Sequence, residues 1–235
     1  MMTRDKAKSR TIAFAFAAFV LTLALAQTAG AKKEKPVEVT HDGLHLVPGS
    51  EVALAYVKPE ADFSIYERVM ILEPYVAFKK GWERDHRGGT TLFRVSKKDM
   101  EEIKTRMAKL FREVFEGTLA AGDGYPVVRK ADDDVLLLRP AIIDLDFTAP
   151  DVDRPARSRV YTSSAGAATL YIELYDSVSG EILARAIDRQ AGRDSMTFQH
   201  STRVNNSTEA QRALSKWARL LRQRLDEIHG KTPVE

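Results

Sequence analysis

Apolar residues recur at steps of three and four along two long segments of the chain, and they alternate with polar residues along several shorter ones. In the first long segment, Ser96 and Asp99 have the spacing of a capping box at the start of a helix. Gly122, Gly124 and Pro126 predict its end, because glycine suits a left-handed cap and proline cannot continue the turn. The apolar stripe that we expect to face the core consists of Met100, Ile103, Met107, Leu110, Phe111, Val114, Phe115 and Leu119.

The second long segment closes the chain. Asn206 and Glu209 form a second cap-like pair, and Gly230 and Pro233 predict the end of the helix. Its basic residues fall opposite the apolar stripe, as they do on an ordinary solvated helix face. The apolar stripe is Leu214, Trp217, Ala218, Leu221, Leu225 and Ile228, and the polar face carries Arg212, Lys216, Arg219 and Gln223.

Between and before these helices the pattern is typical of strands. Residues 68–78 form a nearly continuous apolar run that Pro74 ends or bends, and 169–176 alternate apolar and polar side chains. Strands grouped between two helices indicate an α+β fold. We expect a single domain, a mixed sheet of about five strands, and two long amphipathic helices packed on one face. The predicted strands are 68–78, 125–129, 135–147, 169–176 and 181–190.

The N-terminal segment has the pattern of a secretory signal peptide. Four basic residues precede an apolar run from Thr11 to Ala26, and Ala29-Gly30-Ala31 forms an A-x-A cleavage site. We expect cleavage after Ala31, since the run is shorter than the 20 or so apolar residues of a membrane-spanning helix. Residues 1–31 are therefore predicted to be a signal peptide, 32–60 an extended arm, and 61–230 the globular domain. No later stretch is apolar enough to span a membrane.

Charge and cysteine usage narrow the functional classes. The chain has 36 Lys+Arg and 33 Asp+Glu. The predicted leader holds four of the bases and one of the acids, so the exported part is neutral. A neutral domain gives little reason to expect a nucleic-acid partner. The chain has no cysteine, hence no disulfide and no residue that could carry a lipoprotein's lipid. We expect an exported protein located in the periplasm, either dissolved there or peripheral to the outer membrane.

The sequence offers only weak candidates for a metal site or a catalytic site. His41 and His45 are four apart, but Gly43 between them argues against a helix and no third ligand lies nearby. Asp144 and Asp146 could serve a carboxylate hydrolase, although nothing in the sequence selects that pair. The aspartates of 132–134 match no calcium loop. The sequence therefore predicts no metal, no cofactor and no identifiable catalytic residue.

The loop from 150 to 167 offers the most interesting candidate binding residues. They are Arg154, Arg157, Arg159 and Tyr161. Arginine and tyrosine are enriched at recognition hot spots, and loops carry function more often than scaffolds do. An unstructured, solvated loop is the simpler interpretation. The alternative hypothesis is contact with an acidic partner, which would fail if replacing all three arginines with serine left every interaction unchanged.

Several short motifs, in order and spacing, resemble a bacterial family of unknown function, numbered 3313. The resemblance spans about 42 to 228, and it implies an envelope protein of a Gram-negative-type bacterium, most relatives being lipoproteins. It supplies no catalytic residue, and the missing cysteine departs from the pattern. The motifs are Asp42-Gly43-Leu44, Tyr56 to Pro59, Asp62-Phe63-Ser64 with Tyr66, Asp134 to Leu136 with Arg139 to Ile142, and Leu174 to Glu181 with Leu183 to Arg185 and Asp188.

We therefore expect a non-enzymatic periplasmic binding or assembly module. Its contacts would come from a sheet edge and from the loops at 79–94 and 150–167, and its partner would be an envelope protein or polymer. Two alternatives stay open: a periplasmic hydrolase that uses strand carboxylates, and a structural protein associated with the outer membrane. The sequence leaves the oligomeric state undetermined.

Overall fold

A mixed seven-stranded sheet forms one layer of the protein, and two long helices form the other. The computed structural model describes residues 36–87, 96–146, 161–162, 166–191, 199–200 and 203–231. Within this part, the chain from Val37 onward belongs to a single compact unit. The fold is α+β, as the sequence predicts.

The sheet has the order β1-β2-β8-β7-β5-β3, and β4 also pairs with β5. β3 and β4 run parallel to β5, whereas the other pairs are antiparallel. A separate two-stranded sheet joins β6 (Tyr161–Thr162) to β9 (Gln199–His200). The strands of the main sheet are β1 (His45–Leu46), β2 (Leu54–Val57), β3 (Arg68–Ile71), β4 (Tyr75–Phe78), β5 (Val135–Asp146), β7 (Ala167–Asp176) and β8 (Ile182–Ala191).

The sheet has more strands than the five expected, for two reasons. Pro74 divides the predicted strand 68–78 into β3 and β4, which pair with successive parts of β5. Proline has no N–H to donate to a neighbouring strand, so the hydrogen bonding to β5 is interrupted at Pro74. In addition, residues within the predicted arm 32–60 form β1 and β2, and β2 pairs with β8.

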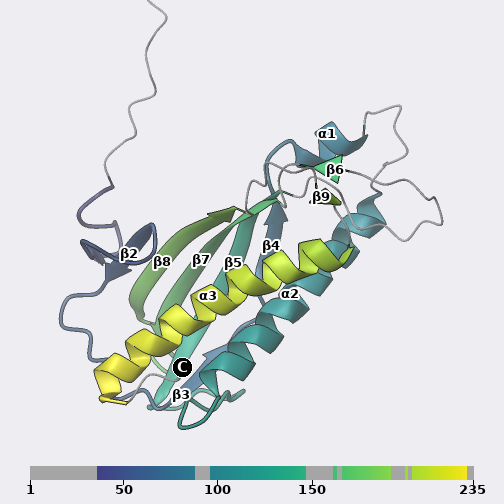
Figure 1. Ribbon diagram of the computed structural model, residues 1–235. Helices are drawn as coiled ribbons and strands as arrows, with labels where there is room; N and C mark the ends of the chain where they lie inside the picture. The colour runs from purple at the N-terminus through teal and green to yellow at the C-terminus, as the bar shows by residue number, and fades with distance from the viewer. Residues whose placement is uncertain are drawn as a thin grey trace, which may run out of the picture. The chain divides into compact units, whose positions relative to one another are not determined.

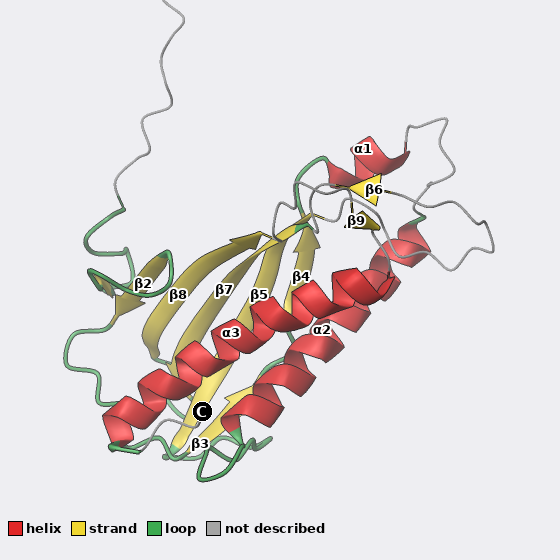
Figure 2. Cartoon of the chain, in the orientation of Figure 1, coloured by secondary structure: helices red, strands yellow, loops and turns green. Residues whose placement is uncertain are grey.

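Both long helices cover the same face of the sheet and run in the same direction along it (Figures 1 and 2). α2 spans Lys97–Leu119 and α3 spans Arg203–His229, while the short α1 spans Trp82–Arg87. The capping box predicted at Ser96 is confirmed. The Asp99 N–H donates to Ser96 Oγ at 3.1 Å, and the Ser96 N–H donates to Asp99 Oδ2 at 2.8 Å.

The core lies between the helices and the sheet. Phe111 and Phe115 are fully buried and stack with ring centroids 3.9 Å apart. The alternation in β7 is confirmed on its apolar side, because Leu170, Ile172 and Leu174 all join this core. Ile228 and Trp82 differ from expectation. Ile228 is 45% exposed, and Trp82, in a segment predicted to be an exposed loop, is 2% exposed and stacks on Phe78.

A buried arginine joins the C-terminal ends of the two helices. Arg222 of α3 pairs with Asp226, with Nε 2.8 Å from both carboxylate oxygens. Its Nη1 donates to backbone carbonyls at the end of α2, at 2.8 Å to Ala121 O and 3.2 Å to Leu119 O. These carbonyls have no partner within their own helix. Arg222 therefore caps α2 from the neighbouring helix.

Candidate functional site

The outer edge of β3 is the side of the strand that faces away from β5. The Leu72 N–H donates across the sheet to Leu138 O at 2.9 Å. Because the direction of backbone groups alternates along a strand, Val69 and Ile71 turn their N–H and C=O groups to the outer edge. The backbone groups of these two residues therefore determine what can pair there.

Among the residues that the structure describes, only the first part of this edge is paired. The Val69 N–H donates to Pro126 O at 3.0 Å, and the Val128 N–H donates to Val69 O at 2.8 Å. Val127 forms an isolated parallel bridge with Val69, so the predicted strand 125–129 is reduced to a single bridge. Among the described residues, Ile71 has no backbone hydrogen-bond partner on this side. The edge is closed at Val69 and open at Ile71.

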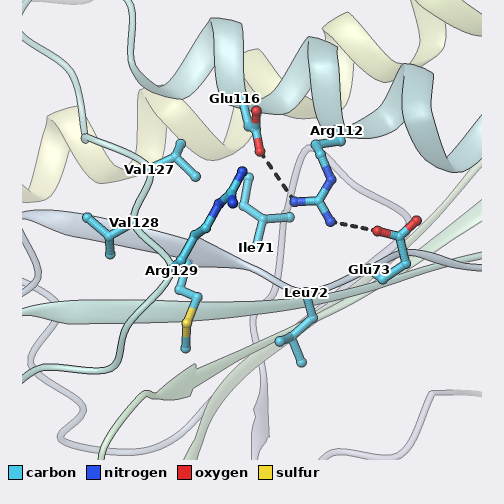
Figure 3. A pocket seen from close by; sticks show the side chains of 9 residues that line it. Ile71, Leu72, Glu73, Arg112, Glu116, Val127, Val128 and Arg129 are labelled. Atoms are coloured by element: carbon cyan, nitrogen blue, oxygen red, sulfur yellow. Dashed lines mark hydrogen bonds and ion pairs between the residues drawn. The ribbon is translucent and has the colours of Figure 1, made fainter.

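A pocket of about 320 Å³ lies where this pairing stops. We call it the edge groove. Its walls come from the end of β3, from one face of α2, and from the segment after Pro126 that leaves the strand (Figure 3). The residues that line it are Met70, Ile71, Leu72, Glu73, Arg112, Glu116, Val127, Val128 and Arg129.

Two arginines give the edge groove its polar character. Arg112 is held between two carboxylates, with Nη2 2.6 Å from Glu73 Oε2 and Nη1 3.3 Å from Glu116 Oε1. The hydrogen bond to Glu73 is the main cause that raises the pKa of Arg112 above its ordinary value. The Arg129 guanidinium also points into the groove (Figure 3), yet it makes no hydrogen bond or ion pair within the described part of the chain. Arg129 is thus a cation available to a ligand.

The chemistry of the groove suits binding better than reaction. Five of its nine described lining residues are apolar and four are charged; Ile71 is 6% exposed and Leu72 is 41% exposed. Its nine described lining residues include no histidine, serine, threonine, tyrosine or cysteine. A hydroxyl or thiol nucleophile with a histidine base cannot be assembled from this set. Both lining carboxylates are already engaged by Arg112.

A second polar cluster lies on the face of the sheet opposite the helices. Glu173 of β7 is 7% exposed and accepts hydrogen bonds from Tyr171 at 2.7 Å, Tyr175 at 2.8 Å and Arg185 at 2.8 Å. Burial alone would raise the pKa of Glu173, but these hydrogen bonds outweigh it and lower the pKa below its ordinary value. All donors to the carboxylate are internal, so the cluster is a closed network.

Asp42 extends this cluster to the N-terminal part of the domain. Arg185 Nη2 lies 2.5 Å from Asp42 Oδ2, and Thr40 Oγ1 donates to Asp42 Oδ1 at 2.5 Å. The hydrogen bond from Arg185 is the main cause that holds the pKa of Asp42 well below its usual range. Arg185 thereby links the segment before β1 to β7, and these ion pairs stabilise the fold.

Three of the four binding residues predicted from sequence lie outside the described part of the chain. These are Arg154, Arg157 and Arg159, whereas Tyr161 belongs to β6. Their role stays a prediction. The predicted contact loops at 79–94 and 150–167 are likewise described only in part.

The proposed carboxylate pair does not form a shared site. Asp144 is exposed and has a left-handed backbone, with φ of 52°, at an irregularity in β5. Asp146 is 2.9 Å from Lys79 Nζ in an ion pair. Within the described part of the chain, no three His, Cys, Asp or Glu side chains gather in a way that could hold a metal ion. This arrangement gives the hydrolase hypothesis no geometric support.

Sequence reasoning missed the edge groove. Arg112 and Glu116 have the (i, i+4) spacing of an ordinary ion pair on a solvated helix face, and Arg129 stands in a polar turn. Nothing in these patterns says that helix and turn border the same strand edge. The apolar run ending at Pro74 was the one available signal, because proline in a strand marks an edge position.

A family model of proteins of unknown function, DUF3313, matches residues 42–221. The chain belongs to the DUF3313 family. The resemblance inferred from the motifs is therefore confirmed. Several motif residues of this DUF3313 protein hold its fold together. Tyr66 donates to Asp176 at 3.0 Å, and Asp188 accepts from Trp217 Nε1 at 2.8 Å.

Solved structures similar to this DUF3313 protein have low sequence identity and low TM-scores. The PelC dodecamer from Paraburkholderia phytofirmans has a TM-score of 0.37 at 10% identity, covering 72% of this chain and 96% of PelC. A candidate lipoprotein from Caulobacter crescentus has a TM-score of 0.32 at 18% identity, covering 54% and 86%. A DUF330 protein from Xanthomonas campestris has a TM-score of 0.34 at 17% identity, covering 74% and 90%. A comparison with curated proteins finds no match.

Among the described residues, none of the helices combines the length and the apolar character needed to cross a bilayer.

Proposed function

We propose that this DUF3313 protein is a non-enzymatic binding or assembly module of the cell envelope, and that the edge groove holds an extended segment of a partner protein. The single observation that carries the proposal is the outer backbone of Ile71, which has no hydrogen-bond partner in the described part of the chain, beside a pocket with apolar and charged walls. A partner segment would add to the sheet next to β3.

The physics of strand addition supports this assignment. An added strand gains affinity from backbone hydrogen bonds and specificity from pockets that take its side chains. The edge groove offers both, because the open backbone of Ile71 borders the pocket directly. An unpaired apolar edge also risks aggregation unless it is short, charged or covered. Here the open part is short, and Glu73 and Arg112 flank it with charge.

Two other functional hypotheses are kept with their tests. The arginine-rich loop at 150–167 remains a second proposed contact, which the triple serine replacement described above would examine. A structural role at the outer membrane predicts that fractionated cells retain the protein with that membrane at high salt.

Site-specific crosslinking in intact cells tests the proposed function. A photoreactive amino acid in place of Leu72, which is 41% exposed at the groove, is expected to form a discrete adduct. The same amino acid in place of Val178, 60% exposed in the turn between β7 and β8, serves as the matched control. Mass spectrometry should map the Leu72 adduct to one short segment of one envelope protein.

Equal adducts from the two positions, or none from Leu72, would count against the groove as the binding site. Adducts scattered over many unrelated proteins would have the same meaning, because strand addition to a shaped groove selects a sequence.

A further inference from the structure

The edge groove is closed at one end and short. Pro126 and Val128 already pair with Val69, so no added strand can continue past that point. In the other direction Pro74 interrupts the strand, and it has no N–H to offer. The open backbone is thus confined to the two or three residues around Ile71. Such a site suits the end of a polypeptide better than its middle.

The charges indicate which end. Arg129 is the lining cation without a partner among the described residues, and its guanidinium points into the groove (Figure 3). Arg112 is occupied by Glu73 and Glu116. A terminal carboxylate would find in Arg129 a charge-assisted donor with two parallel N–H groups. A terminal ammonium would meet the same guanidinium and be repelled.

We infer that the edge groove captures the free C-terminus of an extended polypeptide, lying antiparallel to β3 with its α-carboxylate at Arg129. This inference rests on the proposed function and specifies the partner. The antiparallel direction follows from the position of the closed end at Val69. A partner strand that has its C-terminus there must run from Leu72 toward Val69, which is opposite to the direction of β3.

The groove also indicates the last side chain of the partner. Side chains of paired residues in neighbouring strands share a face. A residue beside Ile71 would therefore point toward α2, between Ile71 and Val127. Both are apolar, and Ile71 is almost fully buried. We expect an apolar C-terminal residue.

Peptide pools test this directly. The probes are ten-residue peptides with a Gly-Ser stem and every combination of residues at the last three positions. They are immobilised once with free C-terminal carboxylates and once as C-terminal amides. Pools that end in an apolar residue are expected to bind the purified protein. Amidation should weaken that binding about tenfold or more, since a hydrogen bond to a charged group contributes about 1.5–3 kcal/mol.

Variants assign the effect to the groove. Arg129→Glu should abolish the preference for a free carboxylate, and Arg129→Lys should restore part of it. Arg219→Glu reverses one exposed charge on α3 and should change nothing. Binding should also slow amide hydrogen exchange at Ile71, whose N–H faces the groove, in wild type but not in Arg129→Glu.

Equal binding of amidated and free peptides would overturn the inference, as would binding carried by an internal acidic residue in amidated pools. Failure of every pool to bind would overturn it too. The proposed function is judged separately. If the Leu72 crosslink still maps to one internal partner segment, the groove binds an extended chain and only the C-terminal assignment is wrong.

Discussion

Arg185 holds two carboxylates from distant parts of the sequence, and one of them connects stability to pH. Its partner Asp42 has a pKa held well below the usual range, chiefly by the hydrogen bond from Arg185. A lowered carboxyl pKa contributes stability that is fully present above the unfolded value, about 3.9 for Asp. That contribution is lost as the pH falls through the lower, folded value.

Asp42→Asn is therefore expected to lower the free energy of unfolding by roughly 1–3 kcal/mol at pH 7, because Arg185 loses a charged acceptor. Urea denaturation at a series of pH values measures the difference from wild type. The difference should shrink as the pH falls below about 4, because Asp42 of the unfolded chain then begins to take up a proton while the native carboxylate, with its lowered pKa, stays charged. Asp133→Asn, at an exposed carboxylate, is the control. A difference that stays constant with pH would contradict this account.

For single residues, the sequence predicts which face of a strand a side chain takes, but not which distant residues it contacts. The alternation in β7 correctly turns Tyr171, Glu173 and Tyr175 to one face of the sheet. It does not reveal that Glu173 is buried there, because Arg185 reaches it from β8 and brings Asp42 from the segment before β1. Asp42 and Arg185 are 143 positions apart. No local spacing rule connects residues at that separation.

The end of α2 shows how one turn depends on a neighbouring helix. Gly124 lies where a Cβ atom would be 2.5 Å from Arg222 Nη1 and closer still to Leu119 O. Both belong to the cap that Arg222 makes on α2. The backbone oxygen cannot move aside without breaking that cap. A side chain at Gly124 would therefore disturb the junction between the two helices.

Gly124→Ala is expected to destabilise the protein by about 1–3 kcal/mol, the usual effect of overpacking. Gly117→Ala is the matched control, because Gly117 is an exposed residue of α2 with open space around its Cβ position. Replacing a glycine within a helix by alanine stabilises the folded protein by roughly 0.5–1 kcal/mol. Thermal unfolding of the two variants should therefore shift in opposite directions. Shifts of the same sign would mean that the Arg222 cap does not restrict the turn.

At the element scale, elements with strong local signals were predictable. The capping box at Ser96, the apolar stripes of both long helices and the hairpin of β7 and β8 all follow from short-range patterns. α1 was missed, since its six residues are too few to show a helical period. The segment 125–129 was predicted as a strand, but it makes only a single bridge, between Val127 and Val69, in the described structure.

The whole molecule decides where the candidate site lies. The edge groove exists because β3 is the last strand in the order β1-β2-β8-β7-β5-β3. Strand order follows from long-range pairing, which periodicity along the chain cannot supply. The sequence therefore predicted a sheet-edge contact in general terms but could not name the edge, nor place Arg112 and Arg129 at the same pocket.

Export is a prediction about the whole chain that protein chemistry can check. N-terminal sequencing of the protein recovered from the envelope fraction should begin at Lys32. Replacing both Ala29 and Ala31 with phenylalanine should block processing, because the cleavage site requires small side chains at these two positions. The processed form should then disappear in favour of a longer, membrane-retained precursor. Recovery of an exported wild-type protein that still carries the leader would contradict the prediction.

The bond between Arg222 and the end of α2 also bears on when the chain can fold. The N–H of Ala53, just before β2, donates to Asp188, 135 positions later, and Ala121 O accepts from Arg222, 101 positions later. Such high contact order makes folding slow, because distant segments must meet before either is stabilised. A chain threaded N-terminus first through a translocon lacks those late partners until it is nearly complete. If the chain is exported as its leader predicts, this order of contacts would delay the native state until the chain has crossed the membrane.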